Sequence, residues 1–137
     1  MRLAHRVGGL VVTAAFVGSA LAGCGSGSSS TLKNPGTQGV EALREEIRSA
    51  LEAHDTKKQC ELFAPALVRE YGETIAACAA KVKEGNYPYP KNPKAFVAGG
   101  AIELSGNQAV YQRPSGTSKL FAAVYAEGSW KVVPDGE

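Results

Sequence analysis

A proline-rich segment divides the chain into two parts that follow different hydrophobic periods. Residues 86–93 read Asn-Tyr-Pro-Tyr-Pro-Lys-Asn-Pro and hold three prolines within six positions. Proline has no backbone N–H and clashes with the preceding helical turn, so this segment excludes both a regular helix and a ladder strand. Apolar residues recur at helical spacing before it and alternate after it. The fold class is therefore predicted as α+β, with helices first and an antiparallel sheet second.

The first helix is expected over residues 38–54. Its charged residues, among them Glu41, Arg44 and Glu45, are expected to face solvent. Acidic and basic residues are mixed on that face, which favours a helix packed on a core over one lying on a membrane. The core-facing residues, at helical spacing, are Val40, Leu43, Ile47, Ala50, Leu51 and His54.

Two further helices are expected before the prolines. A second helix begins at Thr56, with Gln59 three positions later completing a capping-box pattern. Pro65 interrupts it, and the continuation stops at Gly72. A third helix covers residues 73–84. Three N-terminal helices are thus expected to pack on the sheet.

Four antiparallel strands are expected from Lys94 onwards. The first runs towards Leu104 with a bend at Gly99-Gly100, and the others cover residues 109–112, 120–125 and 130–133. Short turns join them into a meander. Residues 120–125 are apolar on both faces, so one face is expected on the helices and the other against a pocket, a dimer partner or nothing.

The N-terminal 23 residues have the composition of a secretory signal. Arg2 and Arg6 form a basic beginning, residues 10–17 are apolar, and small residues follow. The apolar stretch is short for a membrane span, which needs about 20 strongly apolar residues. Cleavage of residues 1–23 is the expected outcome.

The sequence Leu21-Ala22-Gly23-Cys24 resembles the bacterial lipobox. The resemblance implies that Cys24 becomes the lipid-modified mature N-terminus and holds the protein on a membrane by its acyl chains. An ordinary signal with a chance cysteine is the alternative. The protein is expected on the outer face of the cytoplasmic membrane, or on the outer membrane of a bacterium that has one. Residues 24–37 are expected to form a Gly/Ser-rich flexible linker to a domain at 38–137.

Lipidation of Cys24 leaves Cys60 and Cys78 as an even pair. In an oxidising compartment a disulfide between them is expected, and it would join the second helix to the third. Two buried free thiols are the alternative. A redox dithiol is less favoured because the Cys-x-x-Cys spacing is missing.

Charge after cleavage argues against nucleic-acid binding. Without Arg2 and Arg6 the chain has 13 basic and 13 acidic residues, so no basic excess remains. One histidine, His54, also remains. A single histidine without a free cysteine does not make a usual zinc shell, so neither a metal nor another cofactor is expected.

Several motifs together resemble the nuclear transport factor 2-like (SnoaL-like) family, in particular small lipoproteins of actinobacteria. They are the segment from Cys60 to Leu67, the pair Cys78-Ala79, and the closing strand Gly128-Ser129-Trp130-Lys131-Val132. The resemblance covers about residues 38–134. It implies a cone-like fold, with helices on a curved sheet of about four strands.

The favoured function is a non-enzymatic, membrane-anchored module that binds a small apolar ligand or a protein partner, including a second copy of the chain. Tyrosines could line such a surface with an apolar ring and a polar end; the candidates are Tyr87, Tyr89, Tyr111 and Tyr125. The alternative is an isomerase- or dehydratase-type enzyme of the same fold, using His54 with Asp55 or a tyrosine at the cone mouth. For the aromatic residues of the sheet, the alternative is that Tyr111, Tyr125 and Trp130 are ordinary core or half-exposed residues.

Overall fold

The structure is a computed structural model, and it describes residues 31–114 and 118–134. The signal segment 1–23, the lipidation site Cys24 and the linker as far as residue 30 lie outside the described residues. In the part that is described, no helix has the length and apolar character needed to cross a membrane.

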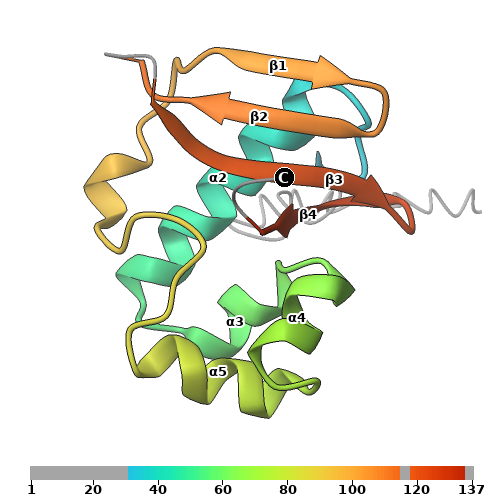
Figure 1. The fold of residues 1–137 in the computed structure, drawn as a ribbon. Coiled ribbons are helices and arrows are strands. Elements are labelled where there is room, and N and C mark those ends of the chain that lie inside the picture. The colour runs from blue at the N-terminus through green and yellow to red at the C-terminus, as the bar shows by residue number, and fades with distance from the viewer. Residues whose placement is uncertain (1–30, 115–117, 135–137) are drawn as a thin grey trace, which may run out of the picture.

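Within residues 37–133, four α-helices precede a four-stranded antiparallel sheet, which confirms the α+β fold class (Figure 1). The proline-rich segment separates the two parts, as its composition predicted. The helices are α2 (Thr37–Glu52), α3 (Thr56–Glu61), α4 (Pro65–Tyr71) and α5 (Ile75–Lys83), followed by the short 3₁₀ helix η1 (Pro93–Ala95). The strands are β1 (Ile102–Ser105), β2 (Gln108–Gln112), β3 (Lys119–Ala126) and β4 (Ser129–Val133).

The strands pair in chain order, β1-β2-β3-β4, as a meander. Two of the connections are two-residue turns. Gly106 has φ 61° in the first, and Glu127 and Gly128 have φ 55° and 81° in the second. A positive φ at the first central residue alone, as in the first turn, is the pattern of type II′, and two successive positive φ values, as in the second, are the pattern of type I′; the twist of both types matches that of the flanking strands. These two turns, both expected from the sequence, therefore fix the register of the β1–β2 and β3–β4 hairpins.

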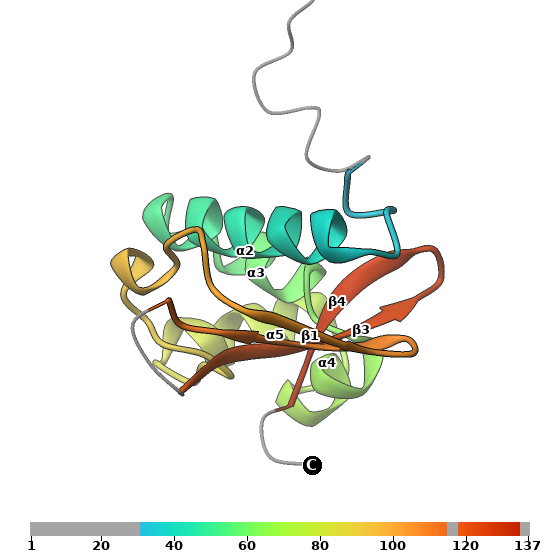
Figure 2. The same cartoon turned by 90° about the horizontal axis from the view of Figure 1, so that it is seen from above.

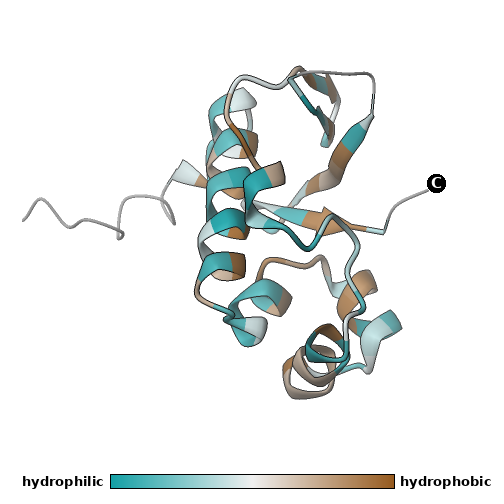
Figure 3. Cartoon of the chain, turned by 90° about the vertical axis from the view of Figure 1, so that its left-hand side faces the viewer, coloured by the Kyte–Doolittle hydropathy of each residue, from teal (hydrophilic) through white to brown (hydrophobic). Residues whose placement is uncertain are grey.

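Helix α2 lies along one face of the sheet (Figure 2). In Figure 3 the apolar residues of α2 gather on one side of the helix, and the buried residues of α2 include Val40, Leu43, Ile47 and Leu51. From the sheet side, Tyr111, Phe121, Ala123, Trp130 and Val132 complete the same core and are almost fully buried. The core therefore lies between α2 and one face of the sheet, and the same buried cluster continues into α3, α4 and α5 through Cys60, Leu67, Cys78 and Val82.

Pro65 ends one helix and begins the next, as expected. It occupies the first turn of α4, where a missing N–H costs no hydrogen bond. The residues between α3 and α4 use their free backbone groups on β4: the Ala64 N–H donates to Val132 O at 2.7 Å, and the Val132 N–H donates to Leu62 O at 2.8 Å. The helix break therefore supplies a short parallel partner to the edge of the sheet.

The expected strand from Lys94 is wrong in its first half. Residues 93–95 form η1, Phe96 is buried in a loop, and the strand begins at Ile102. The chain crosses directly over a strand residue at Gly100, where an added Cβ would lie 2.1 Å from Gln112 O and 2.4 Å from the Tyr111 ring. Glycine is required there by this close approach, which an alternating pattern does not reveal.

The expected linker is also too long. Residues 31–36 pack against the domain, Leu32 is buried, and the Trp130 N–H donates to Leu32 O at 3.1 Å. The Trp130 indole N–H donates to Asn34 O at 2.8 Å. Gly39 in α2 permits this contact, because a Cβ there would meet Asn34 O at 1.9 Å. A single apolar residue among polar ones forms no periodic pattern, so the sequence did not indicate that Leu32 is buried.

Two polar residues of the helices differ from their expected roles. Asp55 caps α3 by accepting a hydrogen bond from the Lys58 N–H at 2.9 Å, so the Thr56–Gln59 capping box does not form.

Arg44, expected in solvent, is buried, and its guanidinium donates to Phe96 O at 2.6 Å and to Glu41 at 2.8 Å. The loop that replaces the expected strand provides this buried carbonyl acceptor.

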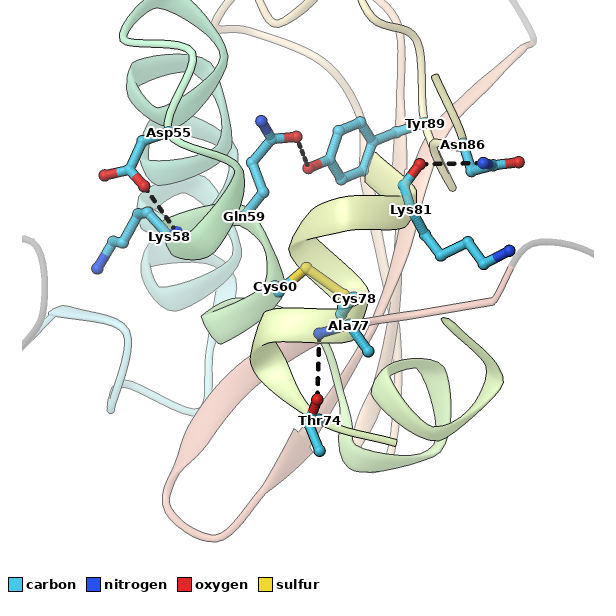
Figure 4. Close-up of a disulfide and its surroundings, with 10 residues drawn as sticks. All are labelled: Asp55, Lys58, Gln59, Cys60, Thr74, Ala77, Cys78, Lys81, Asn86 and Tyr89. Carbon is cyan, nitrogen blue, oxygen red and sulfur yellow. Dashed lines mark hydrogen bonds between the residues drawn. A yellow bond between two sulfur atoms is a disulfide. The ribbon is translucent and has the colours of Figure 1, made fainter. Parts of the chain in front are cut away.

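The disulfide between Cys60 and Cys78 is present and joins α3 to α5 (Figure 4). Both residues are fully buried, and their Cα atoms are 6.0 Å apart. The bond closes a loop that contains all of α4. Cross-linking a loop of this size stabilises a fold by about 3 kcal/mol in the chain-entropy account.

Candidate functional site

Aromatic side chains fill the interior of the fold between the helices and the sheet. Their ring centres are separated by 5.4 Å (Tyr111 to Phe121), 6.4 Å (Phe121 to Phe96), 5.4 Å (Phe96 to Tyr89) and 6.1 Å (Tyr89 to Phe63). These are favourable separations for stacked and edge-to-face pairs. We call these five residues the aromatic column, and it occupies the space between α2, η1 and the sheet.

Tyr111 is a core residue rather than part of an open mouth. Its hydroxyl lies 3.2 Å from both Glu41 Oε1 and Val97 O, and it accepts a hydrogen bond from the Gly100 N–H at 3.1 Å. Burial raises the pKa of Tyr111, and the hydrogen bond from Gly100 opposes that shift. The hydroxyl is therefore fully engaged in holding the loop over the strand.

Tyr89 is buried as well. Its hydroxyl donates to Gln59 Oε1 at 2.8 Å, which satisfies both polar groups inside the core (Figure 4). Burial is the main cause that raises the pKa of Tyr89. The pair explains why Gln59, which is 1% exposed, lies inside the domain instead of capping a helix.

Tyr125 and Tyr87 occupy the surface. The Tyr125 hydroxyl donates to Lys33 O at 2.6 Å, and its ring packs edge-on against Trp130 at 5.5 Å, so it holds the N-terminal segment on the sheet. Tyr87 is half-buried on the proline-rich loop. Of the four candidate tyrosines, Tyr87 borders a cleft at the ends of the helices.

That cleft has a volume of about 660 Å³ and lies between the ends of several helices and the proline-rich loop. The end of α2, the beginning of α3, the end of α5 and the proline-rich loop form its walls. We call it the helix-end cleft, and its lining residues are Leu51, Glu52, His54, Thr56, Gln59, Lys83, Tyr87, Lys91 and Pro93. Its volume is in the range of small-molecule sites, which span about 300–1,000 Å³.

Positive charge dominates the rim of the helix-end cleft. Lys83 and Lys91 are exposed, and within the described ranges neither forms an ion pair with a carboxylate. The Lys91 ammonium lies 5.6 Å from the centre of the Tyr87 ring. Glu52, the one carboxylate in the lining, accepts a hydrogen bond from Arg48 at 2.6 Å and is thereby neutralised. The cleft therefore offers two ammonium groups beside an aromatic ring.

His54 and Asp55 do not form a catalytic pair. His54 follows α2 in the left-handed conformation with φ 53°, and its N–H donates to Leu51 O at 3.2 Å. The Asp55 N–H donates to Ala50 O at 2.9 Å, which completes a Schellman motif. The Asp55 carboxylate caps α3 through Lys58, as described above. His54 thus borders the cleft with an exposed imidazole, and Asp55 has a structural role.

The face of the sheet opposite α2 carries small apolar residues. Val110, Ala122, Val124 and Val133 are half-buried there. Ala66 and Pro134 border the same surface, in a groove of about 330 Å³. Of the covers expected for the second face of residues 120–125, the described residues show a groove.

Metal chemistry has no candidate in the described part of the chain. No group of three or more His, Cys, Asp or Glu side chains gathers there in a way that could hold a metal ion. The two described cysteines, Cys60 and Cys78, form the disulfide.

Sequence reasoning missed Lys83, Lys91 and Gln59. Lys83 lies on the polar side of a helix and Lys91 in a loop, and each is an ordinary surface position in a linear pattern. The fold brings them to one cleft because the chain reverses after α5. The one available signal was the alternation of tyrosine and proline next to Lys91, which fixes the loop beside the helix end.

Comparison of the chain with protein-family models, with curated proteins and with solved structures finds no match.

Proposed function

We propose that this chain is a lipid-anchored protein of the bacterial cell envelope whose domain binds a small ligand without chemical turnover. The observation that carries the anchor is Leu21-Ala22-Gly23-Cys24, placed after a basic and an apolar segment. Lipid on Cys24 would hold the domain at the outer surface of the cytoplasmic membrane, or of the outer membrane where one exists.

The disulfide supports the proposed location independently. Cys60 and Cys78 are paired and buried, and such bonds persist in oxidising compartments outside the cytoplasm. Pairing of these two leaves Cys24 as the cysteine without a partner of its own. Its acylation would account for the odd number of cysteines, three in all.

Binding is favoured over catalysis by the arrangement of polar groups. A general base needs a group that orients it within hydrogen-bond reach, and the carboxylate next to His54 caps a helix instead. The buried tyrosines hold core hydrogen bonds, so they are not available to a substrate. The helix-end cleft has the volume and side chains of a recognition site. Membership of the nuclear transport factor 2-like family remains part of the proposal.

Mass spectrometry of the mature N-terminus tests the anchor. The full chain, expressed in a bacterium and extracted from its membranes, should begin at Cys24 and carry a diacylglyceryl group. Cys24→Ala should be released from the membrane fraction or retain residues 1–23. A mature chain that begins elsewhere, with an unmodified Cys24, would refute the anchor.

A second candidate function is docking of a partner on the face of the sheet opposite α2. The half-buried Val110, Ala122 and Val124 favour it, since a contiguous apolar surface commonly marks an interface. Light scattering after size-exclusion chromatography tests the version in which the partner is a second copy. A dimer that Val124→Lys converts to a monomer supports it; a monomer at high concentration excludes it.

A further inference from the structure

We propose that the helix-end cleft binds a small organic anion, a phosphate or carboxylate group carried on an apolar ring. The inference rests on the proposed function, because it assigns a ligand class to the binding module. Nothing in it depends on lipidation of Cys24, so the two can fail separately.

Charge is the first argument. In the described part of the chain, the five ion pairs involve three cations of the helices, Arg44, Arg48 and Lys58. Lys83 and Lys91 stand apart from these pairs, although both lie at the rim of one cleft. Two ammonium groups at the rim of one cleft repel each other, and a bound anion reduces that repulsion. Hydrogen bonds from ammonium groups to phosphate or carboxylate are also among the stronger ones in proteins.

The position of Lys91 is the second argument. Its ammonium lies over the Tyr87 ring and next to the end of α5, where a Cβ on Gly85 would be 3.0 Å from Lys91 Nζ. The Tyr87 ring and the end of α5 thus limit the movement of the Lys91 ammonium and keep it at the rim of the cleft. A cation that is already placed loses less conformational entropy when a ligand binds.

The walls and floor define the rest of the ligand. Leu51, Tyr87 and Pro93 supply apolar surface, which a bare inorganic anion does not use. At the floor, the buried Gln59 accepts a hydrogen bond from the Tyr89 hydroxyl through Oε1, and its side-chain amide also carries N–H donors. An amide donor beneath two ammonium groups matches a ligand rich in acceptor oxygens.

The test uses phenyl phosphate as the probe. The full chain, extracted in a non-ionic detergent, is titrated while backbone amide shifts are followed by NMR. We expect saturable shifts confined to residues 51–59 and 83–93, with tighter binding than for inorganic phosphate or phenol. Lys83→Gln/Lys91→Gln should weaken binding by about 10-fold or more, since that factor corresponds to only 1.4 kcal/mol.

Lys33→Gln/Arg69→Gln is the matched control. It removes the same charge from exposed positions outside the cleft, so affinity should change less than about 2-fold. Absence of saturable shifts in the cleft at millimolar probe, or equal weakening by both double variants, overturns the proposal. Loss of the anchor in the N-terminal test leaves this result unaffected, and loss of binding here leaves the anchor unaffected.

Competition identifies the source of the anion. Vesicles of phosphatidylcholine with phosphatidic acid are added to the probe complex, beside vesicles of phosphatidylcholine alone. Displacement by the acidic vesicles assigns the cleft to a lipid headgroup at the membrane that holds the protein. Retention of the probe assigns it to a free organic anion. Both outcomes keep the anion chemistry of the site.

Discussion

Replacement of His54 by glycine should stabilise the domain, although it removes a side chain from the cleft. His54 has φ 53° as the residue after α2, a position that glycine occupies in most Schellman motifs. The left-handed conformation costs an L-residue about 1–2 kcal/mol. Glycine avoids that cost but loses about 0.4–1 kcal/mol through the greater freedom of the unfolded chain. The net expectation is a gain of about 0.5–1 kcal/mol.

Thermal unfolding of the full chain in detergent, followed by circular dichroism, measures this gain. For a domain of this size it corresponds to a rise in Tm of about 2–8 °C. His54→Ala is the first control, because it removes the imidazole but keeps a Cβ in the left-handed conformation, so it should not stabilise. Glu73→Gly is the second, since Glu73 has φ 76° after α4 and lies outside the cleft. A Tm for His54→Gly at or below wild type, with Glu73→Gly raised, would refute the reasoning.

Three further predictions concern the core. Cys60→Ala/Cys78→Ala should lower the free energy of unfolding by about 3 kcal/mol, measured by urea denaturation. Because burial raises the pKa of Tyr89, the folded state keeps that proton longer than the unfolded state, so stability should fall as pH rises above the unfolded value near about 10. In urea titrations, the Tyr89→Phe variant should lose less stability at alkaline pH than the wild type. At neutral pH it should be about 1–3 kcal/mol less stable, because Gln59 loses its hydrogen-bond partner. The double variant Tyr89→Phe/Gln59→Leu should recover much of that stability. Gly39→Ala should lower Tm despite alanine's higher helix propensity, because its Cβ would overlap Asn34 O and the Trp130 ring; a raised Tm would contradict that packing.

Periodicity and turn residues were sufficient for most of the fold. The spacing of Val40, Leu43, Ile47 and Leu51 predicted α2, because one apolar face in seventeen residues is satisfied by helical geometry. Pro65 marked the break between α3 and α4, and Glu127-Gly128 marked a hairpin. The disulfide followed from the even pair of cysteines that lipidation of Cys24 would leave.

The failures share a cause, which is contact between residues far apart in the sequence. Phe96 fits the alternating pattern of a strand, yet it is buried in a loop. Its carbonyl oxygen accepts a hydrogen bond from Arg44, and the backbone at Gly100 lies close to the Tyr111 ring. Leu104 alternates as well but is 44% exposed at the free edge of β1. Leu32 is buried against Trp130 from within a stretch that reads as linker. The hydrophobic pattern of a segment indicates its secondary structure but not which distant residues pack against it.

The same distinction separates the tyrosines from the candidate site. Tyr89 and Tyr111 belong to the aromatic column, where truncation would open a cavity and cost several kcal/mol, about 3–5 for a large aromatic. The rim of the helix-end cleft consists of exposed side chains at element ends, such as Lys83 and Lys91, where substitutions usually change stability by about 0.5 kcal/mol or less. A binding site built there can change its charge and shape without loss of the fold. Variants of the cleft can therefore test recognition in a folded protein, whereas variants of the column would test folding alone.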